Sequence, residues 1–157
     1  MNTALRLLLL VPALIFIFVP LALIVAAAYI LAALALHIAV SVLWLPRGRR
    51  VLFVYSDSPL WKPYLKTEVL AHLPGNTVVL NWSGRARWPK ISLAVWLFTV
   101  FAGRREFNPV ALVFRPFAPS KVFRFWRAFR ELKQGKPEHV QRVQDDLFAE
   151  IGRSGDG

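Results

Sequence analysis

The chain has 157 residues, of which 56% are apolar and 18% are charged, and its net charge at pH 7 is +11. Soluble domains are typically about 45–50% apolar, so the composition of part of this chain is not that of a soluble domain. No acidic residue precedes Asp57, and no formally charged side chain lies between Leu7 and Pro46. The residues after 50 suffice for one small core. This composition excludes a multidomain enzyme, a disordered chain and a freely soluble protein, and the lack of cysteine excludes disulfides and thiolate metal sites.

The apolar run over residues 7–44 predicts a membrane anchor. It is almost twice as long as the ~20 residues that cross a hydrocarbon core. Two arrangements fit: one kinked span near residues 21–45, or a hairpin of two spans that meet between Pro20 and Ala28. We favour the hairpin, because burying the whole run requires two crossings. A cleaved secretory signal fits less well, because its apolar region is only about 7–15 residues long.

The charges that flank the run predict its orientation. Arg47, Arg49 and Arg50 follow it directly, and the positive-inside rule then places the rest of the chain in the cytoplasm with either arrangement. Two spans would also keep Arg6 on that side, which is a second reason to favour the hairpin. His37 and Ser41 share one helix face, and we expect them to form an interhelical hydrogen bond or to reach the headgroups.

After Arg50 the pattern becomes that of a small α/β domain. Continuous runs of β-branched and aromatic residues predict strands buried on both faces at 51–55, 77–82 and 110–114. Helical spacing, caps and breakers predict helices at 61–73, 91–103, 120–134 and 138–151. The order β-α-β-α-β-α-α predicts a three-stranded, mostly parallel sheet with helices on both faces.

The predicted organisation is therefore a membrane anchor over residues 1–46, a cytoplasmic α/β domain with a basic surface over 47–151, and a flexible tail over 152–157. The predicted helix 91–103 is apolar nearly all round, yet too short to span a bilayer. We expect it to be the central buried helix. The alternative is a segment that dips into the membrane interface, in which case the domain lies flat on the membrane.

Polar side chains follow each predicted strand. Ligands of open α/β sheets bind outside the carboxyl ends of the strands, and a helix beginning near Ser58 would add backbone donors suited to an anion. A phosphate, sulfate or nucleotide-type group fits this chemistry. The alternative is that Asp57 or Ser58 merely caps the helix. The anion-binding candidates are Ser56, Asp57, Ser58, Ser83, Arg85, Arg87 and Arg115.

Known catalytic patterns do not occur in the sequence. No GxGxxG follows the first strand, and no phosphate-binding GxxxxGK[ST] loop is present. The three histidines, His37, His72 and His139, fall in unrelated segments without the spacing of metal ligands. The sequence therefore assigns no catalytic residue, no metal and no cofactor.

The strongest local signal is basic charge. Residues 51–133 carry thirteen Lys and Arg against four Asp and Glu. On a helix over 120–133, an apolar stripe separates from the arginines, although Phe123 falls among them. We expect the stripe to face the core and the arginines to face anionic headgroups. The membrane-surface candidates are Arg47, Arg49, Arg50, Arg124, Arg127 and Arg130.

These features favour a membrane-anchored accessory or binding protein whose cytoplasmic domain contacts anionic lipid headgroups or a membrane-associated partner. The alternative is an enzyme, or a fragment of one, acting on a phosphorylated, nucleotide-type or lipid-linked substrate at the strand ends. Nucleic-acid binding is a minor alternative, because the sequence has no RNA- or DNA-binding motif and a membrane tether hinders a search along nucleic acid.

Overall fold

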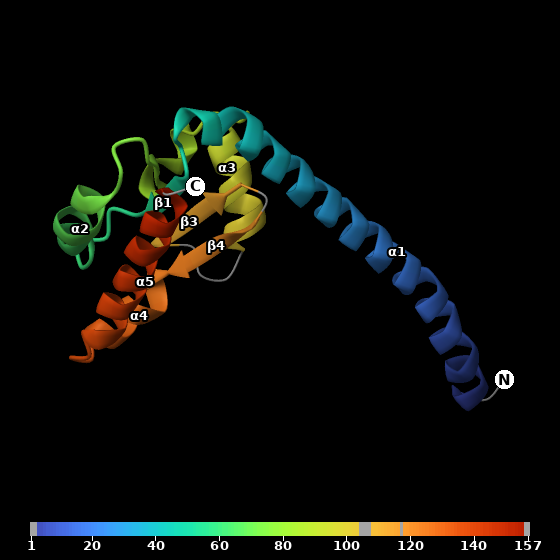
Figure 1. Cartoon of the computed structure of the whole chain (residues 1–157). Coiled ribbons are helices and arrows are strands. Elements are labelled where there is room, and N and C mark those ends of the chain that lie inside the picture. Colours follow the sequence, from blue (N-terminus) through green and yellow to red (C-terminus); the bar gives the residue numbers. More distant parts are fainter. Residues whose placement is uncertain (1–2, 104–107, 117, 156–157) are drawn as a thin grey trace. The chain divides into compact units, whose positions relative to one another are not determined.

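The computed structural model describes residues 3–103, 108–116 and 118–155, with side chains from Leu14 onward. The chain divides into two compact units, Met1–Ala35 and Leu36–Gly157. Figure 1 shows the order of the elements along the chain. The predicted long apolar helix followed by a small α/β domain is confirmed.

Helix α1 is continuous from Thr3 to Ala39. It passes through Pro20 and the three alanines that follow without a turn, so the hairpin is wrong and a single helix is right. The alanines and leucines around the prolines are strong helix formers, and nothing in this stretch supplies turn chemistry. The segment Leu14–Arg47 is long and apolar enough to cross a membrane.

The last turns of the apolar run belong to the core of the second unit. A π-helical segment, η1 (Val40–Trp44), and a 3₁₀ turn, η2 (Leu45–Arg47), follow α1. Leu36, Val40 and Trp44 are four residues apart and therefore lie on one face, and all three are buried in that core. The end of the apolar run is therefore part of the domain core.

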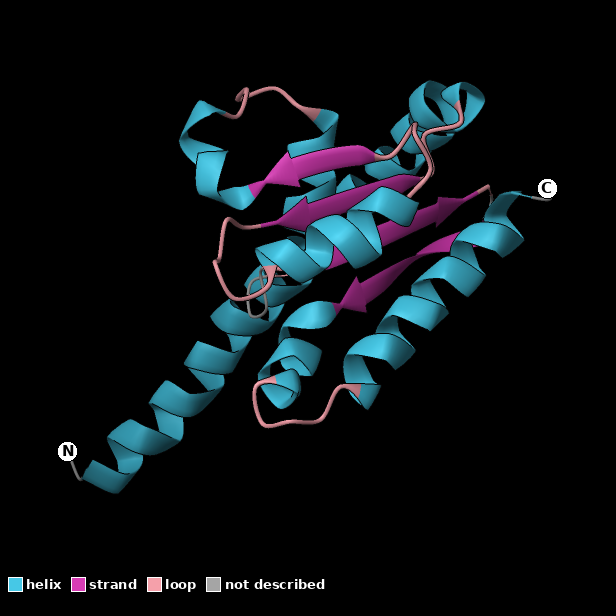
Figure 2. Cartoon of the chain, turned by 90° about the vertical axis from the view of Figure 1, so that its left-hand side faces the viewer, coloured by secondary structure: helices cyan, strands magenta, loops and turns pink. Residues whose placement is uncertain are grey.

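The sheet has four strands, in the order β2-β1-β3-β4 (Figure 2). They are β1 (Val51–Tyr55), β2 (Val78–Asn81), β3 (Val110–Arg115) and β4 (Ala118–Arg124). β1 pairs parallel with β2 and antiparallel with β3, and β3 pairs antiparallel with β4. The prediction of three mostly parallel strands is therefore wrong in the number of strands and in the direction of the third.

Burial on both faces explains that error. Leu52 and Val54 of β1 point into one core cluster, and Phe53 between them points into the other. β3 alternates in the same way, with Leu112 in the first cluster and Val113 in the second. A continuous apolar run reports that both faces of a strand are covered. It carries no information about the direction of the strand.

Helical segments cover the two faces of the sheet in two layers. The first layer contains residues 36–47, η5 (Trp82–Arg87), and the helical pair α3 (Leu93–Leu97) and η6 (Phe98–Ala102). The second layer contains the short helical run α2 (Lys62–Tyr64), η3 (Leu65–Val69) and η4 (Leu70–His72), together with α4 (Phe125–Leu132) and α5 (Glu138–Gly155).

The predicted helix over 120–134 begins later than expected. Residues 118–124 form strand β4, and α4 starts at Phe125. In the strand, Phe123 lies opposite Ala111 and packs against the second core cluster. On a helix the same side chain would lie among arginines, so the sheet offers Phe123 an apolar environment that the helix lacks.

Helix α5 extends beyond its predicted end at Ile151. It continues to Gly155, and Ser154 is buried, with its hydroxyl donating to the backbone oxygen of Glu150 at 2.8 Å. The predicted tail over 152–157 thus begins as helix, and its last two residues lie outside the described residues.

We predict that Gly48→Ala destabilises the domain by about 1–3 kcal/mol. Gly48 has a φ of 70°, and its backbone oxygen accepts a hydrogen bond from Asn76 Nδ2 at 2.5 Å. An added Cβ would lie 2.6 Å from that nitrogen. Alanine would therefore strain the backbone and displace the Asn76 side chain from its hydrogen bond. Urea unfolding of the full chain in detergent micelles, followed by tryptophan fluorescence, measures the change.

Gly75→Ala is the matched control, because a Cβ at Gly75 meets no atom within 4 Å. We expect it to leave the free energy of unfolding nearly unchanged. Equal destabilisation by the two substitutions would contradict the specific role assigned to Gly48.

Candidate functional site

The carboxyl ends of β1 and β2 bring several predicted site residues together. Because these two strands are parallel, the loops after them meet at one edge of the sheet. Asn81 Nδ2 donates to Asp57 Oδ2 at 2.8 Å, and the Asp57 amide donates to Ser83 Oγ at 2.9 Å. The Ser83 amide in turn donates to Asn81 Oδ1 at 2.9 Å. These contacts tie the two loops to one another.

The Asp57 carboxylate is already paired within this cluster. Lys62 Nζ lies 2.6 Å from Asp57 Oδ1. The hydrogen bond from Lys62, and then the one from Asn81, hold the pKa of Asp57 below its ordinary value, and the same contact raises the pKa of Lys62. Asp57 does not cap α2, whose first backbone hydrogen bond runs from the Lys62 amide to the Ser58 oxygen. The role of the cluster is therefore structural: it holds the two loops together.

The predicted arginines do not converge on this edge. Arg85 and Arg87 lie on η5, directly after the cluster, and the Arg85 guanidinium stacks 5.1 Å above the ring centroid of Trp82. Arg115 ends β3, which runs antiparallel to β1, so it lies at the opposite end of the sheet. There the Phe114 amide donates to the Arg50 oxygen at 2.8 Å. The expected meeting of Asp57, Arg85 and Arg115 is therefore wrong.

Arg124 ends β4 at the edge where Arg115 was expected. β4 runs in the same direction as β1, and the register aligns Val54 with Val110 and Val110 with Arg124. Residues directly opposite one another in antiparallel strands share a face of the sheet. Arg124 therefore lies on the face of Val110, which belongs to the first layer.

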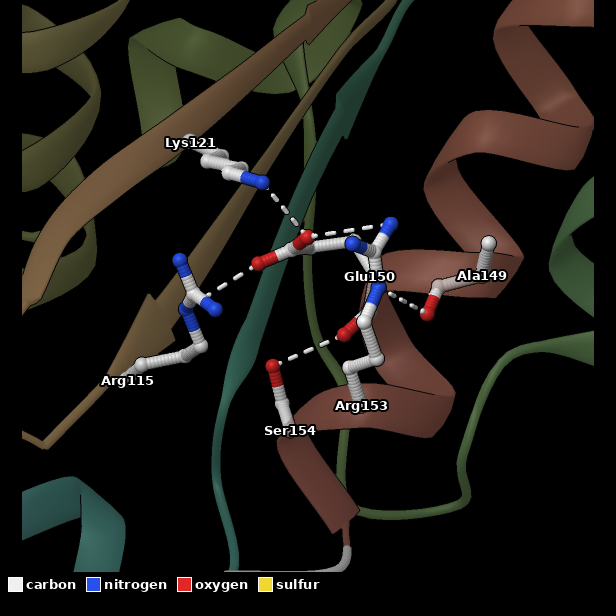
Figure 3. A network of polar contacts seen from close by, with 6 residues as sticks. All are labelled: Arg115, Lys121, Ala149, Glu150, Arg153 and Ser154. Atoms are coloured by element: carbon white, nitrogen blue, oxygen red, sulfur yellow. Dashed lines mark hydrogen bonds and ion pairs between the residues drawn. The ribbon is translucent and has the colours of Figure 1, made fainter.

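An ionic network around one buried carboxylate joins α5 to the other end of the sheet (Figure 3). Glu150 is 1% exposed. Lys121 Nζ of β4 donates to Glu150 Oε2 at 2.7 Å, and Arg115 Nε of β3 lies 3.0 Å from Glu150 Oε1. Arg153, one turn further along α5, lies 3.8 Å from Oε2. Three cations thus surround one carboxylate.

These cations determine the charge state of Glu150. Burial by itself raises the pKa of this carboxyl, but the hydrogen bond from Lys121 and the positive charges of Arg115, Lys121 and Arg153 outweigh it, so the pKa lies below its ordinary value. The ionised carboxylate holds α5 against β3 and β4. Sequence reasoning missed Glu150, although a usable signal existed: it follows Val140, Val143 and Leu147 at helical spacing on the buried face.

The basic candidates fall on different faces of the domain. Arg127 and Arg130 are exposed on α4 in the second layer, and the Arg130 guanidinium lies 4.8 Å from the ring centroid of Trp126. Arg47 belongs to η2 in the first layer, where its Nη1 donates to the Leu43 oxygen at 2.6 Å, and Arg49 beside it is exposed. The predicted set Arg124, Arg127 and Arg130 is therefore not one surface.

Charge is segregated between the two layers. The segments that build the first layer and the loops that adjoin them, residues 36–50 and 82–103, contain six basic and no acidic residues. The segments that build the second layer and their adjoining loops, 56–76 and 125–155, contain eight basic and seven acidic residues. The six basic residues on the first-layer side are Arg47, Arg49, Arg50, Arg85, Arg87 and Lys90. One layer is strongly positive, and the other is almost neutral.

A cavity of about 280 Å³ opens at the end of the sheet opposite Asp57. Its lining includes Arg50, Asn76 and Ser154. Among the described residues, no group of three or more His, Cys, Asp or Glu side chains is placed to hold a metal ion. His139, for example, pairs with Glu131 at 2.7 Å.

No protein-family model, no curated protein and no solved structure matches the chain. The function is therefore argued from the fold, the ionic contacts and the distribution of charge.

We predict that Glu150→Gln destabilises the domain at neutral pH by about 1–3 kcal/mol. The folded pKa of Glu150 is lowered, so its contribution is present above the unfolded value, near 4.5, and is lost as the pH falls through the folded pKa. The free energy of unfolding of the wild type should therefore fall more steeply below pH 4.5 than that of the variant. Urea titrations of the full chain at several pH values measure both.

Asp146→Asn is the control for Glu150→Gln, because Asp146 is an exposed carboxylate on the same helix. It should retain the pH dependence of the wild type. If Glu150→Gln shows the same slope with pH as the wild type, the assigned role of the ionised carboxylate is refuted.

Proposed function

We propose that this protein is a membrane-anchored binding protein whose cytoplasmic α/β domain holds its positive layer against anionic lipid headgroups. One observation carries the proposal: the layer with six basic and no acidic residues is the layer that contains the end of the apolar helix. Polybasic segments next to a membrane span attract anionic lipids, by about 1 kcal/mol for each Lys or Arg near the surface.

The packing of α1 supports its retention as an anchor. Leu36, Val40 and Trp44 supply part of the domain core, so a cut at the end of the apolar run would remove three core side chains. Each buried apolar side chain of this size stabilises a fold by about 1.5–3 kcal/mol. A helix that serves both the membrane and the core is suited to permanent attachment.

Arginines are the appropriate side chains for this contact. A guanidinium presents planar donors that match the oxygens of a phosphate group, and it remains charged at any physiological pH. Arg49, Arg85 and Arg87 are exposed in the first layer. Arg47 and Arg124 are further candidates on the same face, whereas Arg50 lines the cavity beside Ser154 of α5. Arg127 and Arg130 lie in the second layer, and the proposal gives them a smaller share of the contact.

The enzyme hypothesis has less support. It depended on a carboxylate and arginines meeting at the carboxyl ends of the strands, and Arg115 lies at the other end. Asp57, the carboxylate at the expected edge, is paired with Lys62.

We predict that lipids with an anionic headgroup accumulate beside η5. A donor fluorophore on Ala86→Cys, in an otherwise cysteine-free chain, reports this accumulation by energy transfer to acceptor-labelled lipids in nanodiscs. At equal acceptor content, transfer to an anionic acceptor lipid should exceed transfer to a zwitterionic one, and salt should reduce the difference. Replacing Arg49, Arg85 and Arg87 with Gln should remove most of it, because about 1 kcal/mol per arginine corresponds to about fivefold in local lipid concentration.

The matched control replaces Arg127, Arg130 and Lys133 of the second layer with Gln, which removes the same charge. This variant should retain the preference for the anionic acceptor. Equal transfer to both acceptors in the wild type, or an equal loss in the two variants, would contradict the proposed surface.

We also predict that the two ends of the chain lie on opposite sides of the membrane, with the C-terminus in the cytoplasm. A single helix places its ends on opposite sides, and Arg47, Arg49 and Arg50 favour the cytoplasmic side for the domain. Reporter fusions at residues 2 and 157 measure both locations. A C-terminal reporter that is active only outside the cytoplasm would refute the orientation.

A further inference from the structure

The helical pair α3–η6 has an apolar exposed face as well as an apolar buried one. Ala94, Leu97, Phe98 and Ala102 are buried in the first core cluster. On the other side, Trp96 is 47% exposed, and Ile91, just before the pair, is 82% exposed. The hydroxyl of the exposed Thr99 donates back to the Val95 oxygen at 2.9 Å. No charged residue occurs from Ile91 to Gly103. A helix on the water-exposed surface of a domain normally carries polar residues on its outer face.

This pair packs beside the end of the apolar helix. The rings of His37 and Phe101 lie 5.6 Å apart between centroids, and Leu36 and Val40 share a core cluster with Leu97 and Phe98. The outer side of the same stretch exposes further large apolar side chains, with Val42 at 63%. Two neighbouring segments of the first layer therefore both present apolar side chains outward.

The position of residues 36–44 along the helix indicates their depth. A span needs about 20 residues, and the uncharged run from Leu7 to Ala35 is long enough to supply it. The nine residues that follow, 36–44, end at Trp44, and Arg47 comes three residues later. Both residue types are typical of the membrane interface, so we expect residues 36–44 at its boundary. A helix that packs against them lies at about the same depth.

We propose that α3–η6 lies in the interfacial layer of the bilayer, with Ile91 and Trp96 inserted at the boundary between headgroups and acyl chains. The occupant of this exposed face is lipid, because the face adjoins residues 36–44, which continue directly from the membrane-spanning helix. Trp has an apolar ring and a polar N–H and is favoured at this boundary.

Basic side chains frame the pair. Lys90 immediately precedes Ile91 in the sequence, and Arg124 Nη2 would lie 3.7 Å from a Cβ at Gly103, just after the pair. An apolar helical face with basic groups at its ends is typical of segments that lie in the plane of an interface. The inference rests on the proposed function, since it requires α1 to span the membrane. It adds a second membrane attachment, which would hold the domain against the bilayer in one orientation.

Spin labels on single cysteines test this attachment in the full chain, reconstituted in nanodiscs of phosphatidylcholine with one-third phosphatidylglycerol. Oxygen concentrates in the bilayer and a nickel chelate in water, so the ratio of their collision rates with the label reports its environment. Labels replacing Ile91 and Trp96 should show a ratio several-fold higher than a label replacing Leu60. Leu60 is the matched control, because it is apolar, 60% exposed, and precedes α2 of the second layer.

A label replacing Ile24, which is 65% exposed on α1, tests the span separately. If Ile24 is in lipid while both test labels match Leu60, the inference is overturned and the anchor stands. If the Ile24 label also faces water, the proposed function fails with it. Shielding of both test labels from both reagents would show a protein cover, such as a second copy, and would likewise overturn the inference. Circular dichroism of each labelled variant verifies that it has folded.

Discussion

The burial of Leu36, Val40 and Trp44 in the core of the α/β unit is the constraint on which the rest of this structure depends. Trp44 meets Phe114 of β3 edge to face, with ring centroids 6.2 Å apart, and Val40 has no exposed surface. The end of the apolar helix is therefore a structural element of the domain. Residues 36–47 continue from α1 into the domain core without a separate linker.

The distribution of charge follows the same division. Two acidic side chains on the second-layer side are used in internal contacts, Asp57 with Lys62 and Glu150 with Lys121 and Arg115. The contacts of Asp57 hold together the loops after β1 and β2 at one end of the sheet. Those of Glu150 hold α5 against the sheet at the other end. The segments of the first layer contain no acidic residue, so their positive charge is not balanced within the layer. In the proposed function, an anionic bilayer surface would supply the missing negative charge, and the apolar side chains exposed on α3–η6 would favour a close approach of the layer to it.

Much of the local structure could be predicted, and the errors have a common origin. The strand at 51–55 was predicted with its observed bounds, because apolar β-branched and aromatic residues report burial on both faces. The direction of β3 and the strand β4 were missed, because both depend on which strand lies beside which. The same error displaced Arg115 from the candidate site, since an antiparallel strand ends at the opposite edge. Helical spacing of arginines suggested one basic face over 120–133, but the change from strand to helix at Phe125 separates Arg124 from Arg127 and Arg130.

The sequence by itself determined that this protein has a long uncharged helix with arginines at its end, a small α/β domain, no cysteine chemistry and a basic surface. Those conclusions depend on composition and on local periodicity, which each segment carries independently of its neighbours. The tertiary structure alone decided that there is one helix with its end in the core, that the sheet is mixed, and that Glu150 is buried among three cations. It also decided that the positive charge belongs to the layer that contains residues 36–47. These features arise from contacts between segments far apart in the chain, and such contacts depend on which faces pack together, a choice that no single segment encodes.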